Sequence, residues 1–390
     1  MSSAPGARTP PASLRSPYDL GPADLAALAE ASGEPAYRAR QLAHWLDRRH
    51  VWDPAAMTDL PAGLRDGLAG RWAGLGLTEL THQAGDDGWT HKFLFGLAGG
   101  DAVESVLMFH RGEPGKRARA TVCISTQAGC AMGCTFCATG QFGFTRQLSA
   151  GEVVEQVARV WAALPGLRPG ELAPDHLTNV VFMGMGEPFA NPEATWGAAH
   201  RLHDGFGLSA RALTISTVGL VPQIRRAATE PIAVNLAVSI HAPDDALRDQ
   251  LVPVNRTWPI AELLAAVRQY VAATRRRVSF EYALMAGVND SPAQGTALGR
   301  LLDRLRIPGT GGHAAHVNAI PFNPTPGGEF QAPSAAAARR FIEAVAAQGV
   351  PASLRVNRGV GIDAACGQLR TRQGRPGRST VVPIELGAGP

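Results

Sequence analysis

Three cysteines lie close together in the run CAMGCTFC, as Cys130, Cys134 and Cys137. Thiolates are the usual ligands of iron–sulfur clusters, and a cubane cluster normally takes four of them. Three thiols would therefore leave one iron of a [4Fe-4S] cluster open to a substrate or cofactor. A zinc ion is the alternative, but zinc normally takes four protein ligands in paired spacing, and no fourth His or Cys stands beside these three.

A glycine-rich loop follows the next strand-like run, in NVVFMGMGEP over residues 179–188. Gly184 and Gly186 let the backbone approach a ligand closely, and Glu187 can accept hydrogen bonds from an ammonium group. Together with the cysteine spacing, this loop resembles the radical S-adenosylmethionine (SAM) superfamily, in which the amino and carboxylate groups of SAM bind the open iron. The resemblance implies that the reduced cluster cleaves SAM to a 5′-deoxyadenosyl radical.

Two more cysteines, Cys123 and Cys366, bring the total to five, and an odd number argues against a disulfide scaffold. Taken singly, each could be a small buried apolar residue. The motifs ATVCISTQAGC, GMGEP, SIHAPDD and AACGQL follow one another in an order that resembles the RlmN/Cfr family of RNA adenine methyltransferases. The match runs from about residue 35 to about residue 370.

The resemblance implies a reaction that consumes two SAM molecules. One methylates Cys366 by displacement, and the other supplies a radical that takes hydrogen from the S-methyl group. The methylene radical then adds to an electron-poor carbon of adenine and links the enzyme to the RNA. Cys123 helps to resolve this adduct, which leaves a transient disulfide with Cys366. A covalent carrier suits the chemistry, because an aromatic C–H carbon is no nucleophile toward SAM.

A proton must also leave the ring carbon before the product is released, and a carboxylate is a suitable general base. Glu104, in AVESVLM, matches the proton acceptor of the family. Its other interpretation is a solvated carboxylate on a strand. The run HRGEPGKRARA, between Glu104 and Cys123, is longer than in typical bacterial members, and this departure bears on the assignment of Glu104.

Contacts to SAM also carry over from the family motifs. Most of these residues lie at the carboxyl ends of strand-like runs, where barrel active sites are built. The residues that the resemblance assigns to SAM are Gly186, Glu187, Ser216, Ser239, Ile240, His241 and Asn323.

Alternating strand and helix segments must position these residues. Strand-like runs at 178–183, 212–217, 233–240, 278–284 and 315–320 alternate with helical segments at 149–163, 192–204, 260–273, 293–305 and 334–348. This alternation predicts an α/β fold with parallel strands. Five or six such units fall short of the eight in a full barrel, so we expect an incomplete (β/α)6 radical SAM barrel, open on one side. Ser149 and Glu152 predict a capping box at the first of these helices.

The remaining segments flank the barrel. We expect helices at 22–31, 35–48 and 61–73, and short strands in HKFLFGL, AVESVLMF and ATVCIS. The predicted parts are a disordered leader over 1–17, a small helical, RNA-binding domain over 18–78, a β extension over 79–118, the partial barrel over 119–350, and a C-terminal segment over 351–390 with Cys366 and a basic tail.

No window approaches the roughly 18 consecutive apolar residues of a membrane span, and the N-terminus lacks the apolar centre of a signal peptide. We therefore predict a cytoplasmic protein without a membrane partner. A net charge of +4 permits a nucleic-acid partner without requiring one. Lysine occurs only at Lys92 and Lys116, so nearly all the positive charge is arginine.

Basic clusters are the candidate phosphate contacts, although such runs are often only solvated faces. They are Arg38, Arg40, Arg48 and Arg49; Arg111, Lys116, Arg117 and Arg119; the run RRR at 275–277; and Arg370, Arg372, Arg375 and Arg378 in the tail. The target adenine must be exposed, which favours structured RNA with an unpaired or extrudable base.

The resemblance thus implies a radical SAM methyltransferase that acts on carbon 2 of an adenine in 23S ribosomal RNA, with transfer RNA as a second substrate left open. Flavodoxin or ferredoxin would supply electrons. Methylation at carbon 8, as in Cfr, is the alternative, because Gly361 in RVNRGVGID stands where an acidic residue is common in RlmN members. A non-enzymatic iron–sulfur protein that binds RNA or carries electrons is an alternative of another class.

Overall fold

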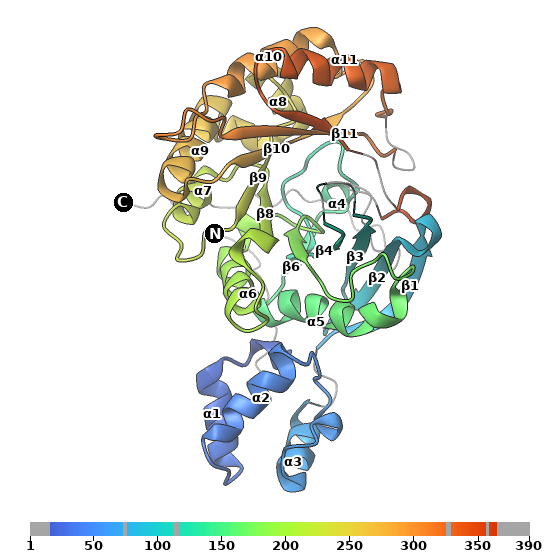
Figure 1. Cartoon of the computed structure of the whole chain (residues 1–390), viewed down its shortest axis with the longest axis vertical. Helices are drawn as coiled ribbons and strands as arrows, with labels where there is room; N and C mark the ends of the chain where they lie inside the picture. The colour runs from blue at the N-terminus through green and yellow to red at the C-terminus, as the bar shows by residue number, and fades with distance from the viewer. Residues whose placement is uncertain are drawn as a thin grey trace, which may run out of the picture.

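The computed structural model describes residues 16–72, 76–112, 115, 117–324, 329–355 and 359–364. Cys366, the basic tail and Lys116 lie outside these ranges, as does the predicted leader up to residue 15. The described chain forms an α/β body, with the N-terminal helices (blue) at one end of the long axis (Figure 1).

Seven parallel strands form the core of the body, and each pairs with the next strand in the order of the sheet. They are β4 (Arg119–Cys123), β7 (Asn179–Phe182), β8 (Leu213–Thr217), β9 (Asn235–Ser239), β10 (Val278–Leu284), β11 (Ala315–Pro321) and β12 (Ala352–Leu354). The first six are the strands of the incomplete (β/α)6 barrel that the sequence predicts, and β12 adds a short strand at one edge.

Helices link the parallel strands and cover the outer face of the sheet (Figure 1). The long ones are α5 (Ala150–Leu167), α6 (Pro192–Asp204), α9 (Ile260–Thr274), α10 (Pro292–Asp303) and α11 (Ala335–Ala346). Helix α5 begins where predicted, because Ser149 Oγ accepts from the Glu152 N–H at 3.1 Å and Glu152 Oε2 accepts from the Ser149 N–H at 2.9 Å. The predicted capping box is therefore confirmed.

Two short helices at the carboxyl ends of strands were missed by the sequence prediction. Helix α7 (Val221–Ala227) follows β8, and α8 (Asp245–Leu251) follows β9. Each has 7 residues, which is too short for a helical period to be recognised. Helix α4 (Ala138–Gln141) is a single turn beside the cysteine run.

Three antiparallel strands extend the sheet on the β4 side. They are β1 (Thr78–Gly85), β2 (Thr90–Gly96) and β3 (Ala102–His110), in the sheet order β1-β2-β3-β4. A separate ribbon of β5 (Gln127–Gly129) and β6 (Phe144–Gln147) brackets the cysteine run. The predicted β extension therefore forms one continuous sheet with the barrel.

The N-terminal domain consists of α1 (Pro22–Ala31), α2 (Tyr37–Asp47) and α3 (Ala62–Trp72). These bounds confirm the three predicted helices, whose apolar stripes include the buried Leu25 and Leu42. The leader was predicted to extend to residue 17, but Ser16 and Pro17 are buried, and Ser16 Oγ donates to Glu155 Oε2 at 2.5 Å. This contact with α5 makes residues 16 and 17 part of the fold.

Among the described helices, none has both the length and the apolar character needed to cross a membrane.

Candidate functional site

The cysteine run forms one wall of a cavity of about 170 Å³ at the carboxyl ends of the barrel strands, called the cysteine cavity below. Cys130, Cys134 and Cys137 all line it. The run leaves the β5–β6 ribbon in a tight turn, where the Cys130 N–H donates to the Gly143 carbonyl at 2.8 Å. Gly129 precedes the run with a φ of 78°, and a Cβ there would come within 2.0 Å of that carbonyl oxygen.

The thiols of the run are suited to a cluster and less suited to a single ion. Within the described ranges, no three His, Cys, Asp or Glu side chains are arranged to hold one metal ion. Thiolates at the corners of a cubane each bind a different iron, so they need not converge on one point. Burial raises the pKa of Cys130 to about 12 and raises that of Cys134 well above its ordinary value. Cluster binding must therefore displace protons from these thiols.

The glycine-rich loop after β7 forms a second wall of the cysteine cavity. Gly186 has a φ of 97°, and a Cβ there would approach the Gln127 side chain to 2.6 Å. Glu187 is buried, and its two carboxylate oxygens accept from the backbone N–H groups of Phe189 at 3.0 Å and Val218 at 2.9 Å. Burial raises the pKa of Glu187 to about 7, although these two hydrogen bonds act to lower it. A ligand ammonium would stabilise the charged form of this carboxylate.

The other residues assigned to SAM come from three different strand ends. Ser216, Ser239, His241 and Asn323 line the same cavity. Ile240 does not line it, because its side chain is fully buried and its backbone N–H donates to the Glu281 carbonyl at 3.0 Å.

His241 is held as a neutral imidazole at the cavity. It has a φ of 56°, and its Nδ1 accepts from the Ala283 N–H at 3.0 Å. Burial, with a smaller contribution from Arg248, lowers the pKa of His241 to about 3. The Phe136 ring lies edge-on to the imidazole at 4.6 Å between centroids. The imidazole therefore serves as a fixed wall of the cavity rather than a charge.

Arg248, on α8, is a positioning residue that the sequence prediction missed. Its side chain is fully buried, and it donates to the carbonyls of Val218 at 2.6 Å, Ser239 at 3.2 Å and Ile240 at 3.1 Å. It also donates to Asn255 Oδ1 at 2.7 Å. One guanidinium thus ties together the loops that follow β8 and β9, where the cavity residues lie.

A second cavity, of about 1700 Å³, runs along the barrel interior and is called the arginine cavity below. Eight arginines line it: Arg111, Arg117, Arg119, Arg211, Arg275, Arg276, Arg277 and Arg355. Cys123 also lines it. The two cavities adjoin, because five residues line both: Met183, Glu281, Ile320, Asn323 and Arg355. Two of the basic clusters picked out in the sequence therefore meet in one space beside the cysteine cavity.

Glu281, on β10, lies at the junction of the two cavities and was not predicted from the sequence. Its Oε1 accepts from Ser279 Oγ at 2.7 Å and from Asn318 Nδ2 at 3.0 Å. Its Oε2 is buried and has no hydrogen-bond partner among the described residues. A buried acceptor of this kind is suited to a ligand hydroxyl or amino group.

Glu104 is buried on β3 and lines neither cavity in the described residues. It shares a face of the strand with Val106 and Met108, which do line the arginine cavity. Lys92 Nζ lies 3.4 Å from Glu104 Oε1. Cys123 pairs across the sheet with Val106, so Glu104 and Cys123 project from the same face.

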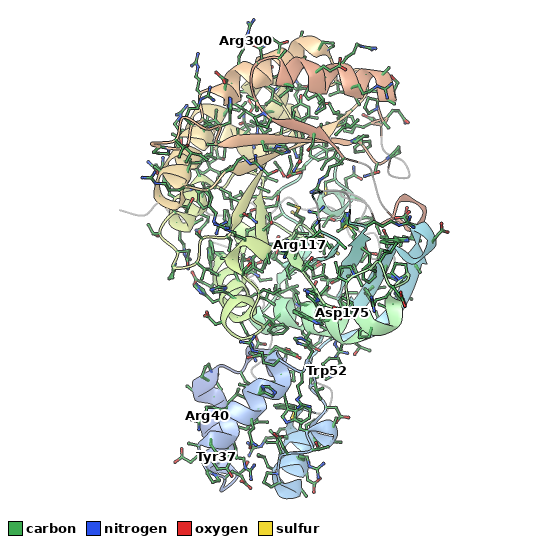
Figure 2. All side chains as sticks on the ribbon, viewed as in Figure 1. Tyr37, Arg40, Trp52, Arg117, Asp175 and Arg300 are labelled. Atoms are coloured by element: carbon green, nitrogen blue, oxygen red, sulfur yellow. The ribbon has the colours of Figure 1, made fainter. Side chains whose placement is uncertain are left out.

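The arginines of the helical domain lie apart from the arginine cavity. Arg38 pairs with Glu34 at 3.3 Å, Arg48 donates to the Asp204 carbonyl at 3.2 Å, and Arg49 stacks over Trp45. Figure 2 shows Arg40 on this domain, well separated from Arg117 in the body. Any RNA contact of these arginines would therefore lie far from the cavity.

Comparisons with known proteins identify the family of this chain. The radical SAM superfamily model matches residues 124–298, and the model of the ribosomal RNA large subunit methyltransferase N-terminal domain matches residues 18–72. A probable dual-specificity RNA methyltransferase RlmN of Chloroflexus aurantiacus is 49% identical over 363 residues, covering 92% of this chain and 93% of that protein. The protein of the same name from a Parafrankia species is 50% identical over 375 residues, covering 92% and 93%.

A solved structure extends the match to the fold. The crystal structure of a radical SAM methyltransferase from Sphaerobacter thermophilus superposes with a TM-score of 0.82 at 50% identity, covering 91% of this chain and 99% of that one. The matches span the helical domain and the barrel together. This chain therefore belongs to the RlmN family of radical SAM RNA methyltransferases.

Proposed function

We propose that this enzyme methylates carbon 2 of an adenine in 23S ribosomal RNA, with transfer RNA as a second substrate, through an S-methyl group carried on Cys366. The observation that supports this best is the adjacency of the two cavities, with three cysteines in one and Cys123 among arginines in the other. The names of the relatives support the substrate class, since they are described as probable dual-specificity RNA methyltransferases.

Cys130, Cys134 and Cys137 would hold the [4Fe-4S] cluster, and Glu187 would accept from the amino group of SAM. Gly186, Ser216, Ser239, His241 and Asn323 would complete the SAM site, and Ile240 would support it from behind, because its N–H bond to the Glu281 carbonyl joins the end of β9 to β10. When bound, the cluster and two SAM molecules per turnover would supply the methyl group, a carbon radical that takes hydrogen from it, and an acceptor for the one electron that the RNA adduct must lose.

The remaining steps use side chains of the chain itself. Cys366 accepts the methyl group and carries it to the adenine ring. Glu104 takes the proton from the methylated carbon, and its burial keeps water from competing for that proton. The Cys123 thiolate then attacks the Cys366 sulfur, and the S–S bond forms as the bond between that sulfur and the methylene carbon breaks. The methylene carbon keeps the electron pair and takes a proton to become the methyl group, so the RNA is released and a transient disulfide remains. The location of Cys123 in the arginine cavity supports this role, because the RNA adduct would form there.

The arginine cavity would hold the RNA backbone around the target base. Arginine forks match phosphate oxygens, and most of the exposed arginines of this cavity, namely Arg111, Arg117, Arg119, Arg275 and Arg277, come from residues 111–119 and 275–277. The helical domain would contact RNA elsewhere. We place the reaction in the cytoplasm, with flavodoxin or ferredoxin as the electron donor.

Mass spectrometry of nucleosides tests the proposal. 23S ribosomal RNA and transfer RNA would be taken from a strain without its own methyltransferase that expresses this chain or its Cys366→Ala variant. We expect 2-methyladenosine with the first and none with the second. An 8-methyl product would overturn the choice of carbon. Full methylation by Cys366→Ala would overturn the carrier mechanism. Absence of SAM cleavage by the reduced, cluster-loaded protein would favour a non-enzymatic iron–sulfur protein.

A further inference from the structure

Three neighbouring strands bring Lys92, Val106 and Cys123 into one row across the sheet. Lys92 of β2 pairs with Val106 of β3, and Val106 pairs with Cys123 of β4. Paired residues project from the same face, and Glu104 lies two residues before Val106 on that face. The lysine, the carboxylate and the cysteine therefore share one surface. This register depends on the pairing of β2, β3 and β4 and is absent from any single motif.

Lys92 contacts two separate parts of the chain, the Glu104 side chain and the backbone of Asp363. Its Nζ lies 3.4 Å from Glu104 Oε1, with only 12% and 5% of the two side chains exposed. The same Nζ donates to the backbone carbonyl of Asp363 at 3.3 Å. Asp363 lies three residues before Cys366. One ammonium group thus links the Glu104 carboxylate to the segment that leads into Cys366.

A second bond anchors the same segment on the β1–β2 hairpin. The Gly359 N–H donates to Asp86 Oδ2 at 2.8 Å, and this oxygen also accepts from Thr90 Oγ1 at 2.6 Å. Gly359 has a φ of 67°, and a Cβ there would come within 2.8 Å of Ala364 and 2.9 Å of Thr90. The close fit requires glycine. Figure 1 shows this segment (red) beside the blue strands β1 and β2, far from it in the sequence.

The composition of the chain adds an independent argument. Lysine occurs at only two positions, 92 and 116, whereas the other basic side chains are arginines. A lysine ammonium is a compact charge that can face two oxygens at once from a narrow buried position, whereas the planar guanidinium needs more room. A lysine in this chain is therefore most easily explained by the restricted space between Glu104 and Asp363.

We infer that Lys92 is a positioning residue that holds the proton acceptor Glu104 ionised and ties it to the backbone that carries Cys366. The inference rests on the proposed function, since it needs Glu104 and Cys366 in their proposed roles. Among the described residues, Lys92 of β2 forms an ion pair with Glu104, Cys123 of β4 projects from the same face of the sheet, and the Asp363 carbonyl binds the same ammonium. Lys92→Met therefore removes the 3.4 Å ion pair with the Glu104 carboxylate.

The test compares Lys92→Met, which keeps the chain length, with Lys92→Arg, which keeps the charge. Both are made in the cluster-loaded full chain with Cys366 already methylated. One turnover is followed across pH with RNA, SAM and reductant, and both 5′-deoxyadenosine and methylated adenosine are measured. Glu104→Gln is run beside them. Arg201→Met is the matched control. Arg201 lies on α6, its side chain is 15% exposed, and it pairs with Asp47 of α2 at 2.9 Å.

For Lys92→Met we expect 5′-deoxyadenosine within about threefold of the wild type but methylated adenosine release slowed by about tenfold or more at neutral pH. The fall of the release rate at low pH, called the acid limb below, should move to higher pH. The reason is that a carboxylate that loses a neighbouring cation takes up a proton more readily. Lys92→Arg keeps the charge, so its acid limb should stay near that of the wild type, although the larger guanidinium should restore only part of the rate. Arg201→Met should lower stability without moving the acid limb.

Hydrogen exchange of the unreacted protein gives a second readout. The 359–364 peptide should exchange faster in Lys92→Met than in Lys92→Arg, because Lys92→Met removes the hydrogen bond to the Asp363 carbonyl. The inference is overturned if Lys92→Met keeps the wild-type release profile, or if it loses 5′-deoxyadenosine and product together with no shift of the acid limb. If Glu104→Gln releases product at the wild-type rate, the proposed role of Glu104 itself is wrong. If Glu104→Gln is blocked and Lys92→Met is not, only the role of Lys92 is wrong.

Discussion

The cysteine cavity and the arginine cavity share five wall residues but differ in charge and exposure. In the cysteine cavity, burial shifts Cys130, Glu187 and His241 toward their neutral forms. In the arginine cavity, nearly all the arginines are exposed. The first cavity therefore selects a ligand by shape and by a few buried hydrogen bonds. The second attracts a polyanion by charge, which needs no exact fit.

The difference teaches how one barrel can serve two ligands of very different size. Rigid loops at the carboxyl ends of the strands, tied by Arg248, fix the small cavity. The interior surface of the sheet, rich in polar side chains, lines the large one. Substitutions in the arginine cavity should therefore leave SAM binding nearly intact, and substitutions in the cysteine cavity should leave RNA binding nearly intact.

The largest effect is expected from Arg248→Met. The change leaves three backbone carbonyls and one amide oxygen without their donor in a fully buried site. Each buried acceptor that loses its donor costs about 1–3 kcal/mol in the free energy of unfolding. Urea unfolding of the protein should show this loss, and the variant should also load its cluster incompletely. Arg268→Met, at an exposed position of the long helix α9, should change the unfolding free energy by about 0.5 kcal/mol or less. Equal stability of the two variants would contradict the positioning role of Arg248.

The sequence predicted the features that depend on neighbouring residues and missed those that depend on contacts between distant elements. The helices and long strands followed from apolar periodicity and caps, as at Ser149, because those signals are local. The cysteine run and the glycine-rich loop were also found, since each is a compact motif whose residues act together. Both kinds of signal lie within about ten residues of sequence.

Arg248, Glu281 and Lys92 were missed for one physical reason. Each is recognised only by its contacts with other elements. Arg248 contacts the loop after β8, Glu281 contacts β11, and Lys92 contacts β3 and the 359–364 segment. Such contacts depend on strand register and on the tilt of neighbouring elements, which a single sequence does not specify. The basic clusters were recognised as charge, but their meeting in one cavity required the fold.

A smaller effect is expected from Arg117→Gln combined with Arg119→Gln, which removes two charges from the arginine cavity. RNA affinity should fall by about tenfold at physiological salt, and the slope of log affinity against log salt should become shallower by about 1 for each phosphate that is no longer neutralised. SAM cleavage without RNA should be unchanged. Filter binding across salt concentrations measures the slope.

Arg300→Gln is the control for this experiment. Arg300 is exposed on α10, and Figure 2 shows it far from Arg117. Its substitution should leave both the affinity and the salt slope unchanged. A similar fall in affinity with Arg300→Gln would mean that RNA is held by the general charge of the surface, and the two cavities would then no longer differ in how they bind.

The smallest effect concerns pH in the cysteine cavity. Burial raises the pKa of Glu187 to about 7, so below pH 7 this carboxyl is mainly protonated in the unliganded protein. A ligand ammonium needs the ionised form, and binding must therefore release the proton. The affinity for S-adenosylhomocysteine should weaken as pH falls below 7, by at most about tenfold per pH unit. Glu187→Gln should bind more weakly and lose this dependence.

The pKa of Glu187 is shifted in the opposite direction to that of the surface carboxylate Glu193. Glu193 is exposed on α6, and its hydrogen bond with Arg226 lowers its pKa, so it stays ionised throughout the range from pH 6 to 8. Glu193→Gln should keep the wild-type pH dependence when the affinity is measured by calorimetry with the cluster in place. An affinity that rises toward acid pH would show that Glu187 binds the ligand as a neutral donor. The cysteine cavity would then recognise its ligand without any charge on the protein, and the contrast with the arginine cavity would be sharper still.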